Sequence, residues 1–93
     1  MPERAVIVGS RTGLHARPAA LFVQAAAAAP VPVRISVAGR APVDARSMLA
    51  VLSLGATQGT QVTLYAEGDG ADEALDSLAD LLARDLDAQD LDA

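Results

Sequence analysis

The sequence predicts an α+β fold, an open-faced two-layer sandwich in which three helices cover one face of a four-stranded antiparallel sheet. Four short segments alternate apolar with polar residues or are rich in β-branched residues, and three other segments repeat apolar residues at helical spacing. These segments follow one another in the order βαββαβα, which suits a two-layer architecture. A chain of 93 residues is long enough for one such core and too short for two. We therefore expect a single domain over residues 1–93.

The first two predicted elements are a strand and a helix, joined by a loop. Residues 4–8 read RAVIV, a β-branched run that ends at the loop sequence GSRTG, and this pattern is typical of a strand followed by a turn. From Ala16 onwards, apolar residues recur at helical spacing until Pro30 and Pro32 prevent the helix from continuing. The first helix is thus expected to begin directly after His15.

The next segment is predicted to form two strands joined by a turn. Residues 31–37, VPVRISV, place valines and isoleucine on one face and Arg34 and Ser36 on the other, the period-2 pattern of a half-buried strand. Ala38 and Gly39 suit a turn, and residues 40–43 then suit a short strand in which Pro42 fits an edge position.

The second half of the chain is predicted to form a helix, a strand and a helix. Residues 44–56 contain a two-turn helix with Ser47 as its N-cap and Gly55 as its stop signal. Residues 60–68 alternate apolar and polar side chains, as an antiparallel strand does. Residues 70–84 begin with acidic residues, which suit a helix N-terminus, and carry one apolar stripe: Ala71, Leu75, Leu78, Leu81 and Leu82.

The C-terminal segment is predicted to lie outside the folded core. Residues 86–93 are rich in aspartate and carry no sustained apolar pattern, so we expect an acidic tail that frays from an ordered core of about residues 3–85.

The composition excludes several classes of function. The chain contains no cysteine, which removes disulfides, thiolate metal sites and cysteine nucleophiles and favours the cytoplasm. Neither a nucleotide-binding motif nor a cluster of metal ligands is present, so no cofactor and no metal are expected. The absence of lysine and an aromatic content of only 2% argue against nucleic-acid binding.

Membrane insertion is not expected either, because no segment is long and apolar enough to span a bilayer. The arginine-flanked residues 19–30 imitate the end of a secretion signal, but Pro18 and Gln24 interrupt the apolar stretch and a cleaved signal would discard the first strand.

The charges are distributed unevenly along the chain. Residues 1–60 hold six arginines against two acidic residues, whereas residues 61–93 hold one arginine against ten acidic residues. This asymmetry predicts an acidic partner for the first part of the chain and a solvated acidic end.

His15 is the only histidine in the chain, and its predicted place is the N-cap of the first helix. There, the backbone N–H groups of Ala16 and Arg17 have no partner within the helix, and Pro18 has no N–H to satisfy. Together with the helix dipole these groups favour a bound anion, to which the Arg17 guanidinium can add a charge-assisted contact. The same field disfavours an imidazolium, so we expect a neutral, nucleophilic ring suited to accept a phosphoryl group. The alternative is that His15 is only a polar capping residue at a turn and Arg17 a solvated surface charge.

Two segments resemble a known family. Residues 13–23, GLHARPAALFV, and residues 46–64, RSMLAVLSLGATQGTQVTL, are similar to the two signatures of HPr, the histidine-containing phosphocarrier of the bacterial phosphoenolpyruvate:sugar phosphotransferase system. The resemblance covers nearly the whole chain, and it implies the antiparallel sheet order 1-4-2-3.

The resemblance also implies a function and its partners. His15 would carry the phosphoryl group on Nδ1, and Arg17 together with the amides of Ala16 and Arg17 would hold the phosphate. The donor would be enzyme I, charged from phosphoenolpyruvate, and the acceptors would be the IIA domains of sugar permeases. The protein would then be a phosphoryl relay that acts as a monomer, and not a free-standing enzyme.

Ser47 and its neighbours are expected to have two further roles. Ser47 is first of all a helix N-cap, but in some relatives the serine at this place is a regulatory phosphorylation site, so an HPr kinase or a transcriptional regulator is a further candidate partner. The resemblance implies a docking patch beside the histidine, with Arg11, Arg17 and Arg46 in its charged rim. Its predicted members are Thr12, Ala20, Arg46, Met48, Leu49 and Leu52.

Two alternatives stay open from the sequence. One is a regulatory module that binds partners through the same face without passing phosphate, although a related regulatory group lacks the histidine that this chain has. The other is a nitrogen-related or fructose-specific phosphocarrier branch. Gln24 and Ala27 stand where many relatives carry lysines on the first helix, which predicts a thinner basic rim.

Overall fold

The computed structural model describes residues 2–84, so the predicted tail, residues 86–93, lies outside the described residues. Seven elements follow one another in the predicted order. They are β1 (Glu3–Ile7), α1 (Ala16–Ala27), β2 (Val33–Val37), β3 (Val43–Asp44), α2 (Met48–Ser53), β4 (Gln61–Ala66) and α3 (Ala71–Ala83).

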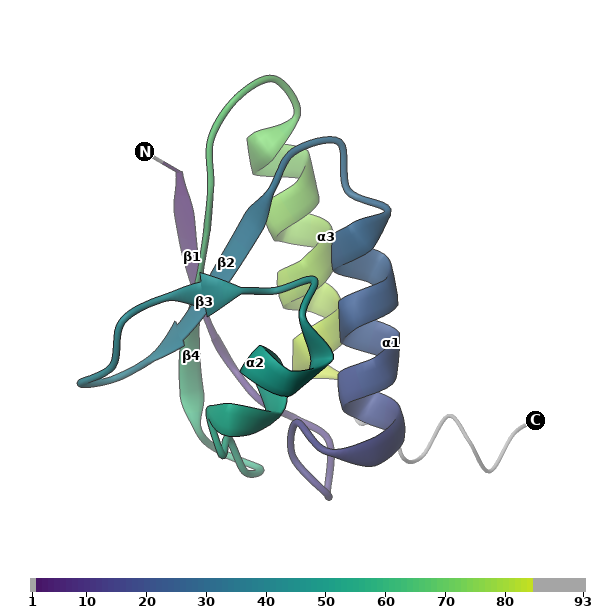
Figure 1. The fold of residues 1–93 in the computed structure, drawn as a ribbon, viewed down its shortest axis with the longest axis vertical. Helices are drawn as coiled ribbons and strands as arrows, with labels where there is room; N and C mark the ends of the chain where they lie inside the picture. The colour runs from purple at the N-terminus through teal and green to yellow at the C-terminus, as the bar shows by residue number, and fades with distance from the viewer. Residues whose placement is uncertain (1, 85–93) are drawn as a thin grey trace.

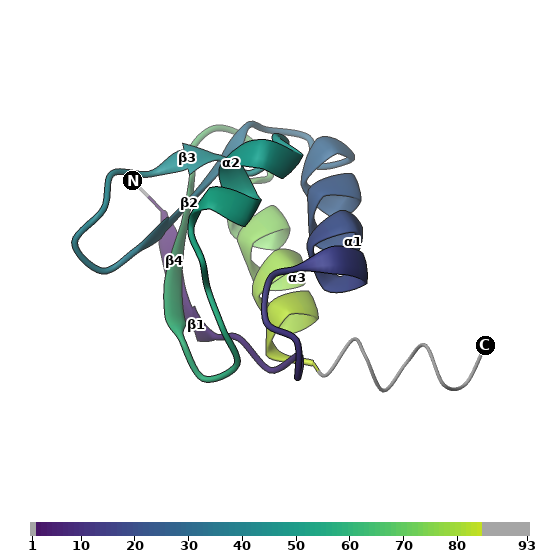
Figure 2. The same ribbon diagram turned by 60° about the horizontal axis from the view of Figure 1, so that its bottom comes forward.

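The four strands form one sheet in the order β1-β4-β2-β3. Each neighbouring pair is antiparallel, which confirms the expected order. The three helices lie on one side of this sheet, with α1 beside α3 and α2 next to β3 (Figure 1 and Figure 2). Within residues 2–84 the opposite face of the sheet carries no helix, so the sandwich is open-faced as predicted.

The core forms between the helices and the sheet, where the apolar residues of the two periodic patterns meet. In β4, Val62, Leu64 and Ala66 are buried and the intervening residues are not, because successive side chains of a strand point to opposite faces. The helices contribute Phe22 from α1 and a row of leucines from α3. Because aromatic residues are scarce, large aliphatic side chains provide much of the buried apolar surface of the core.

Two side chains do not lie where the apolar pattern places them. Ser36, predicted on the polar face of its strand, is only 6% exposed. Its hydroxyl donates to the Tyr65 hydroxyl at 3.4 Å, because β2 is an inner strand flanked by β4. Leu81, predicted on the buried stripe of the last helix, is half-buried, since the stripe facing the sheet is narrower than the predicted one.

The bounds of β3 also differ from the prediction. The strand comprises Val43–Asp44 and not residues 40–43, because Pro42 has no N–H to donate to the ladder. The strand therefore takes Asp44 from the segment predicted as helix, and α2 begins at Met48 with Ser47 as its N-cap. Strand β3 and helix α2 are thereby joined by only Ala45, Arg46 and Ser47.

Candidate functional site

His15 occupies the N-cap of α1, as the sequence predicts. Its backbone is extended (φ −133°, ψ 163°), and its carbonyl accepts a bond of 3.4 Å from the Ala19 N–H. Its side chain is exposed and forms no capping hydrogen bond. The His15 ring therefore faces solvent and does not bond the first helical amides, as a capping side chain would.

Ala16, the first residue of α1, adopts a left-handed conformation with φ +49°. Alanine is disfavoured there because its Cβ approaches the backbone, at a cost of about 1–2 kcal/mol. A left-handed residue followed by a right-handed one directs successive N–H groups to the same side, the geometry of an anion-binding nest. The Ala16 and Arg17 amides thus form such a nest beside His15. No sequence signal pointed to this conformation, since alanine has no preference for it.

The loop before His15 is held from two sides. At its start, the Gly9 N–H donates to the Leu82 carbonyl at the end of α3 at 2.9 Å, and the Gln58 side-chain amide donates to the Gly9 carbonyl at 3.2 Å. A Cβ at Gly9 would lie 2.1 Å from the Ala83 carbonyl oxygen, so the close approach to α3 requires glycine. The loop that carries the histidine is therefore fixed to the rest of the fold before it reaches the helix.

Three of the predicted phosphate-binding and docking residues lie within four residues of His15 in the chain. Arg17 lies in the first turn of α1, and Arg11 and Thr12 lie in the loop that leads to His15; all three are exposed. The structure therefore brings two guanidinium-bearing residues and the amide nest to the end of the molecule that carries the histidine. This arrangement can hold an anion with several negatively charged oxygens.

Helix α2 presents the predicted apolar patch. It packs against α1, and Figure 1 shows α2 and the start of α1 at the same lower end of the molecule. Leu49 is 83% exposed, whereas Met48, Leu52 and Ala20 are half-buried. Leu49 is therefore the residue of this patch with the most surface to offer a partner.

Ser47 caps α2. Its hydroxyl oxygen accepts a hydrogen bond of 3.2 Å from the Ala50 N–H, so the prediction of an N-cap is confirmed. Its side chain is half-buried beside Met48. The oxygen that accepts this capping bond is the atom to which a phosphoryl group would be attached.

Arg46, predicted in the charged rim, is exposed but paired. Its Nε donates to Asp44 Oδ1 at 3.2 Å and its Nη2 to Oδ2 at 3.3 Å. The Arg46 guanidinium lowers the pKa of the Asp44 carboxyl below its ordinary value, chiefly by hydrogen bonding, and the carboxylate raises the pKa of Arg46 in turn. The charge of Arg46 is thus compensated within the chain.

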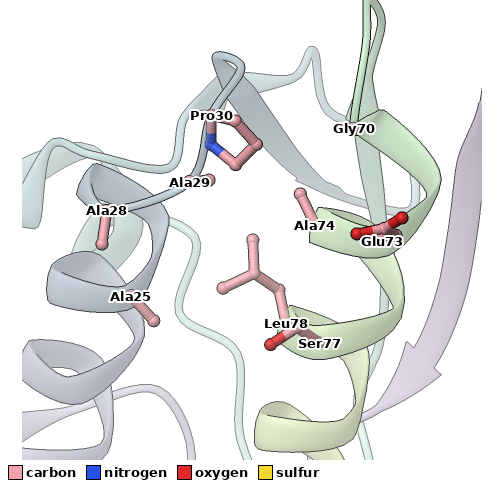
Figure 3. A pocket seen from close by; sticks show the side chains of 9 residues that line it. All are labelled: Ala25, Ala28, Ala29, Pro30, Gly70, Glu73, Ala74, Ser77 and Leu78. Carbon is pink, nitrogen blue, oxygen red and sulfur yellow. The ribbon is translucent and has the colours of Figure 1, made fainter.

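Other parts of the described structure offer little chemistry. No group of three or more metal-ligating side chains occurs within residues 2–84, and no helix among them is long and apolar enough to cross a membrane. A cavity of about 400 Å³ lies between the end of α1 and the start of α3. Figure 3 shows Leu78 directed into it, with Ala25 and Ala74 on either side. It lies at the C-terminal end of α1, opposite the end that carries His15.

Comparison with known proteins gives consistent matches. Residues 2–84 match the family described as PTS HPr component phosphorylation site. The phosphocarrier protein HPr of Streptomyces coelicolor is 54% identical over 86 residues, which cover 92% of this chain and 92% of that protein. The HPr-like protein Crh of Bacillus subtilis is 44% identical over 79 residues, which cover 85% of this chain and 92% of that protein.

A solved structure shares the fold. The crystal structure of HPr-C-His from Thermoanaerobacter tengcongensis superimposes with a TM-score of 0.82 at 43% identity, covering 88% of this chain and 91% of that one. The sequence matches and the structural match therefore cover almost the same part of this chain.

Proposed function

The chain belongs to the family of HPr phosphocarriers of the phosphotransferase system, and on that premise we propose that His15 accepts a phosphoryl group and passes it on. The observation that carries the proposal is the arrangement at the start of α1: an exposed ring without a capping bond stands beside the left-handed Ala16 and the Arg17 side chain. A nucleophile next to an anion nest is what a temporary phosphoryl carrier requires.

The proposed transfer step involves one nitrogen and one anion site. The lone pair of Nδ1 of His15 forms a bond to phosphorus while the bond from phosphorus to the donor breaks. In a loose transition state the negative charge is spread over the three phosphoryl oxygens. The amides of Ala16 and Arg17 and the Arg17 guanidinium compensate this charge, and because the protein positions them beforehand, little reorganisation is needed during transfer.

The proposed partners are enzyme I as donor and the IIA domains of sugar permeases as acceptors, in the cytoplasm. A single histidine must meet donor and acceptor in turn, so both would dock on the same surface. That surface comprises Leu49 as an apolar anchor, with Thr12, Ala20, Met48 and Leu52 around it and Arg11, Arg17 and Arg46 at its rim. Exposed apolar anchors with a charged rim are typical of interfaces that form and dissociate.

Phosphorylation of Ser47 stays a prediction. A phosphate on its oxygen would add about −2 charge beside the docking surface and would oppose an acidic partner. An HPr kinase would be the modifying partner, and the N-cap bond to Ala50 is the interaction that modification would change.

Phosphoryl transfer can be tested directly. The purified protein is incubated with labelled phosphoenolpyruvate and catalytic enzyme I, and we expect an acid-labile, base-stable label that is absent from His15→Ala. Gln24→Ala, a change of an exposed residue on the same helix, serves as the matched control and should label normally. A wild type that does not label, or a His15→Ala variant that labels fully, would contradict the relay and favour a regulatory module that only binds partners.

A further inference from the structure

The loop that carries His15 touches the segment after α2 through backbone atoms. The Leu14 N–H donates a hydrogen bond of 2.9 Å to the Ala56 carbonyl. Leu14 and Ala56 are each only 1% exposed, so water does not compete for this bond, and losing it would leave a buried polar group without a partner. The bond therefore fixes the loop firmly at the residue directly before His15.

Gly13 brings the two segments into still closer contact. Its φ of +71° lies in the region that favours glycine. A Cβ at this position would lie 2.5 Å from the Ala56 carbonyl oxygen and 2.7 Å from Thr57 Cα. Both neighbours are backbone atoms, which cannot move aside as a flexible side chain can. Any side chain at position 13 would therefore separate the loop from residues 56 and 57.

The contact between residues 13–14 and 56–57 links the end of α2 to the residue that carries the reactive ring. On one side, only Leu54 and Gly55 separate the last residue of α2, Ser53, from Ala56. On the other side, Leu14 is followed directly by His15 and by the strained Ala16. A strained conformation persists only where the surrounding structure over-determines it. The position of the ring thus depends on where the segment after α2 holds the loop.

We propose that Gly13, Leu14, Ala56 and Thr57 form a backbone clamp that positions His15 relative to the docking surface on α2, with Gly13 as the positioning residue. The inference rests on the proposed phosphoryl relay and adds to it the element that determines the reach of the histidine. A partner that docks on Leu49 meets the ring at a distance set through α2, residues 54–57 and this clamp. Transfer in both directions then requires the same clamp, because donor and acceptor use the same ring.

The matched pair of variants Gly13→Ala and Gly39→Ala tests the clamp. Gly39 also has a left-handed φ, +81°, but a Cβ there meets nothing within 4 Å, and it lies in the turn after β2. Both variants incur the same kind of backbone strain, and only one pushes the clamp apart. For Gly13→Ala we expect kcat of phosphoryl transfer from enzyme I to fall about tenfold to a hundredfold while KM stays near that of Gly39→Ala, because misplacement of a reacting group affects the chemical step.

A second variant leaves the side chains unchanged. The protein is made by chemical synthesis with the α-hydroxy analogue of leucine at position 14, so that an ester replaces the amide and the donor to the Ala56 carbonyl is lost. This variant should also lower kcat with little change in KM, even if Gly13→Ala does not fold. If the wild type labels and both variants keep the kcat of Gly39→Ala, the clamp is overturned and the relay stands. If the wild type does not label, the relay and the clamp fail together.

Discussion

Arg46 folds back on Asp44, two residues earlier in the chain, and both its backbone N–H and its guanidinium donate to the same carboxylate. Asp44 ends β3 and Arg46 precedes the N-cap of α2. The pair therefore closes the short connection between the sheet edge and the helix that carries Leu49.

The Asp44 pair predicts a dependence of stability on pH. Because its pKa is lowered in the folded state by Arg46, the carboxylate stabilises the fold at pH values above its unfolded pKa, and this contribution is lost as the pH falls through the folded value. We expect Asp44→Asn to flatten the loss of unfolding free energy below about pH 4. Urea titrations at several pH values measure the unfolding free energy of each variant. The control is Asp69→Asn, because Asp69 is an exposed residue in the turn before α3. Identical acid profiles for wild type and Asp44→Asn would contradict the prediction.

Leu49 should matter for partners and not for folding. Since its side chain is 83% exposed, Leu49→Gln should change the unfolding free energy by less than about 0.5 kcal/mol. The KM for transfer from enzyme I should rise about tenfold, as for loss of an interface anchor. The matched control is Ile7→Thr, because Ile7 is the other exposed large apolar residue among residues 2–84, 50% exposed, and it lies on the sheet face that none of the described helices covers. An equal effect of both changes on KM would argue against a docking role for α2.

Loss of the Ser47 cap should destabilise the protein. Ser47→Ala removes the acceptor for the Ala50 N–H, which typically costs about 0.5–2 kcal/mol. Ser53→Ala is the internal comparison, because that exposed hydroxyl only donates to the Ala50 carbonyl within the same helix. Chemical denaturation should show a clearly smaller change for Ser53→Ala, and the reverse order would refute the capping role.

The strain at Ala16 should be measurable as a gain in stability. Ala16→Gly releases the cost of φ +49°, and although glycine also gains freedom in the unfolded chain, we expect a net stabilisation of up to about 1 kcal/mol. Ala19→Gly, a change at a buried position in the same helix, should destabilise by about 1 kcal/mol or more. A comparison of thermal midpoints decides the matter: if both variants lose stability equally, Ala16 is not strained.

Much of the fold follows from local signals. The proline pair after α1, the Ser47 cap, the glycine after α2 and the period-2 pattern of β4 each act within a few residues, so their elements could be predicted one by one. The position of His15 at a helix N-terminus followed in the same way, from Pro18 and the apolar spacing after it. The strand order came only with the family resemblance, because alternation within a strand does not specify its neighbours.

The sequence by itself determined the elements, their apolar faces and a lone histidine beside an arginine at a helix start, because these depend on propensity and periodicity over short distances. Only the tertiary structure decided how that histidine is held. The left-handed Ala16, the exposed ring without a capping bond, the pairing of Arg46 with Asp44 and the contact of Gly13 with Ala56 appear only after the loops are packed together. The physical reason is that close backbone approach and local strain are imposed by neighbours distant in the chain, and no local pattern records them.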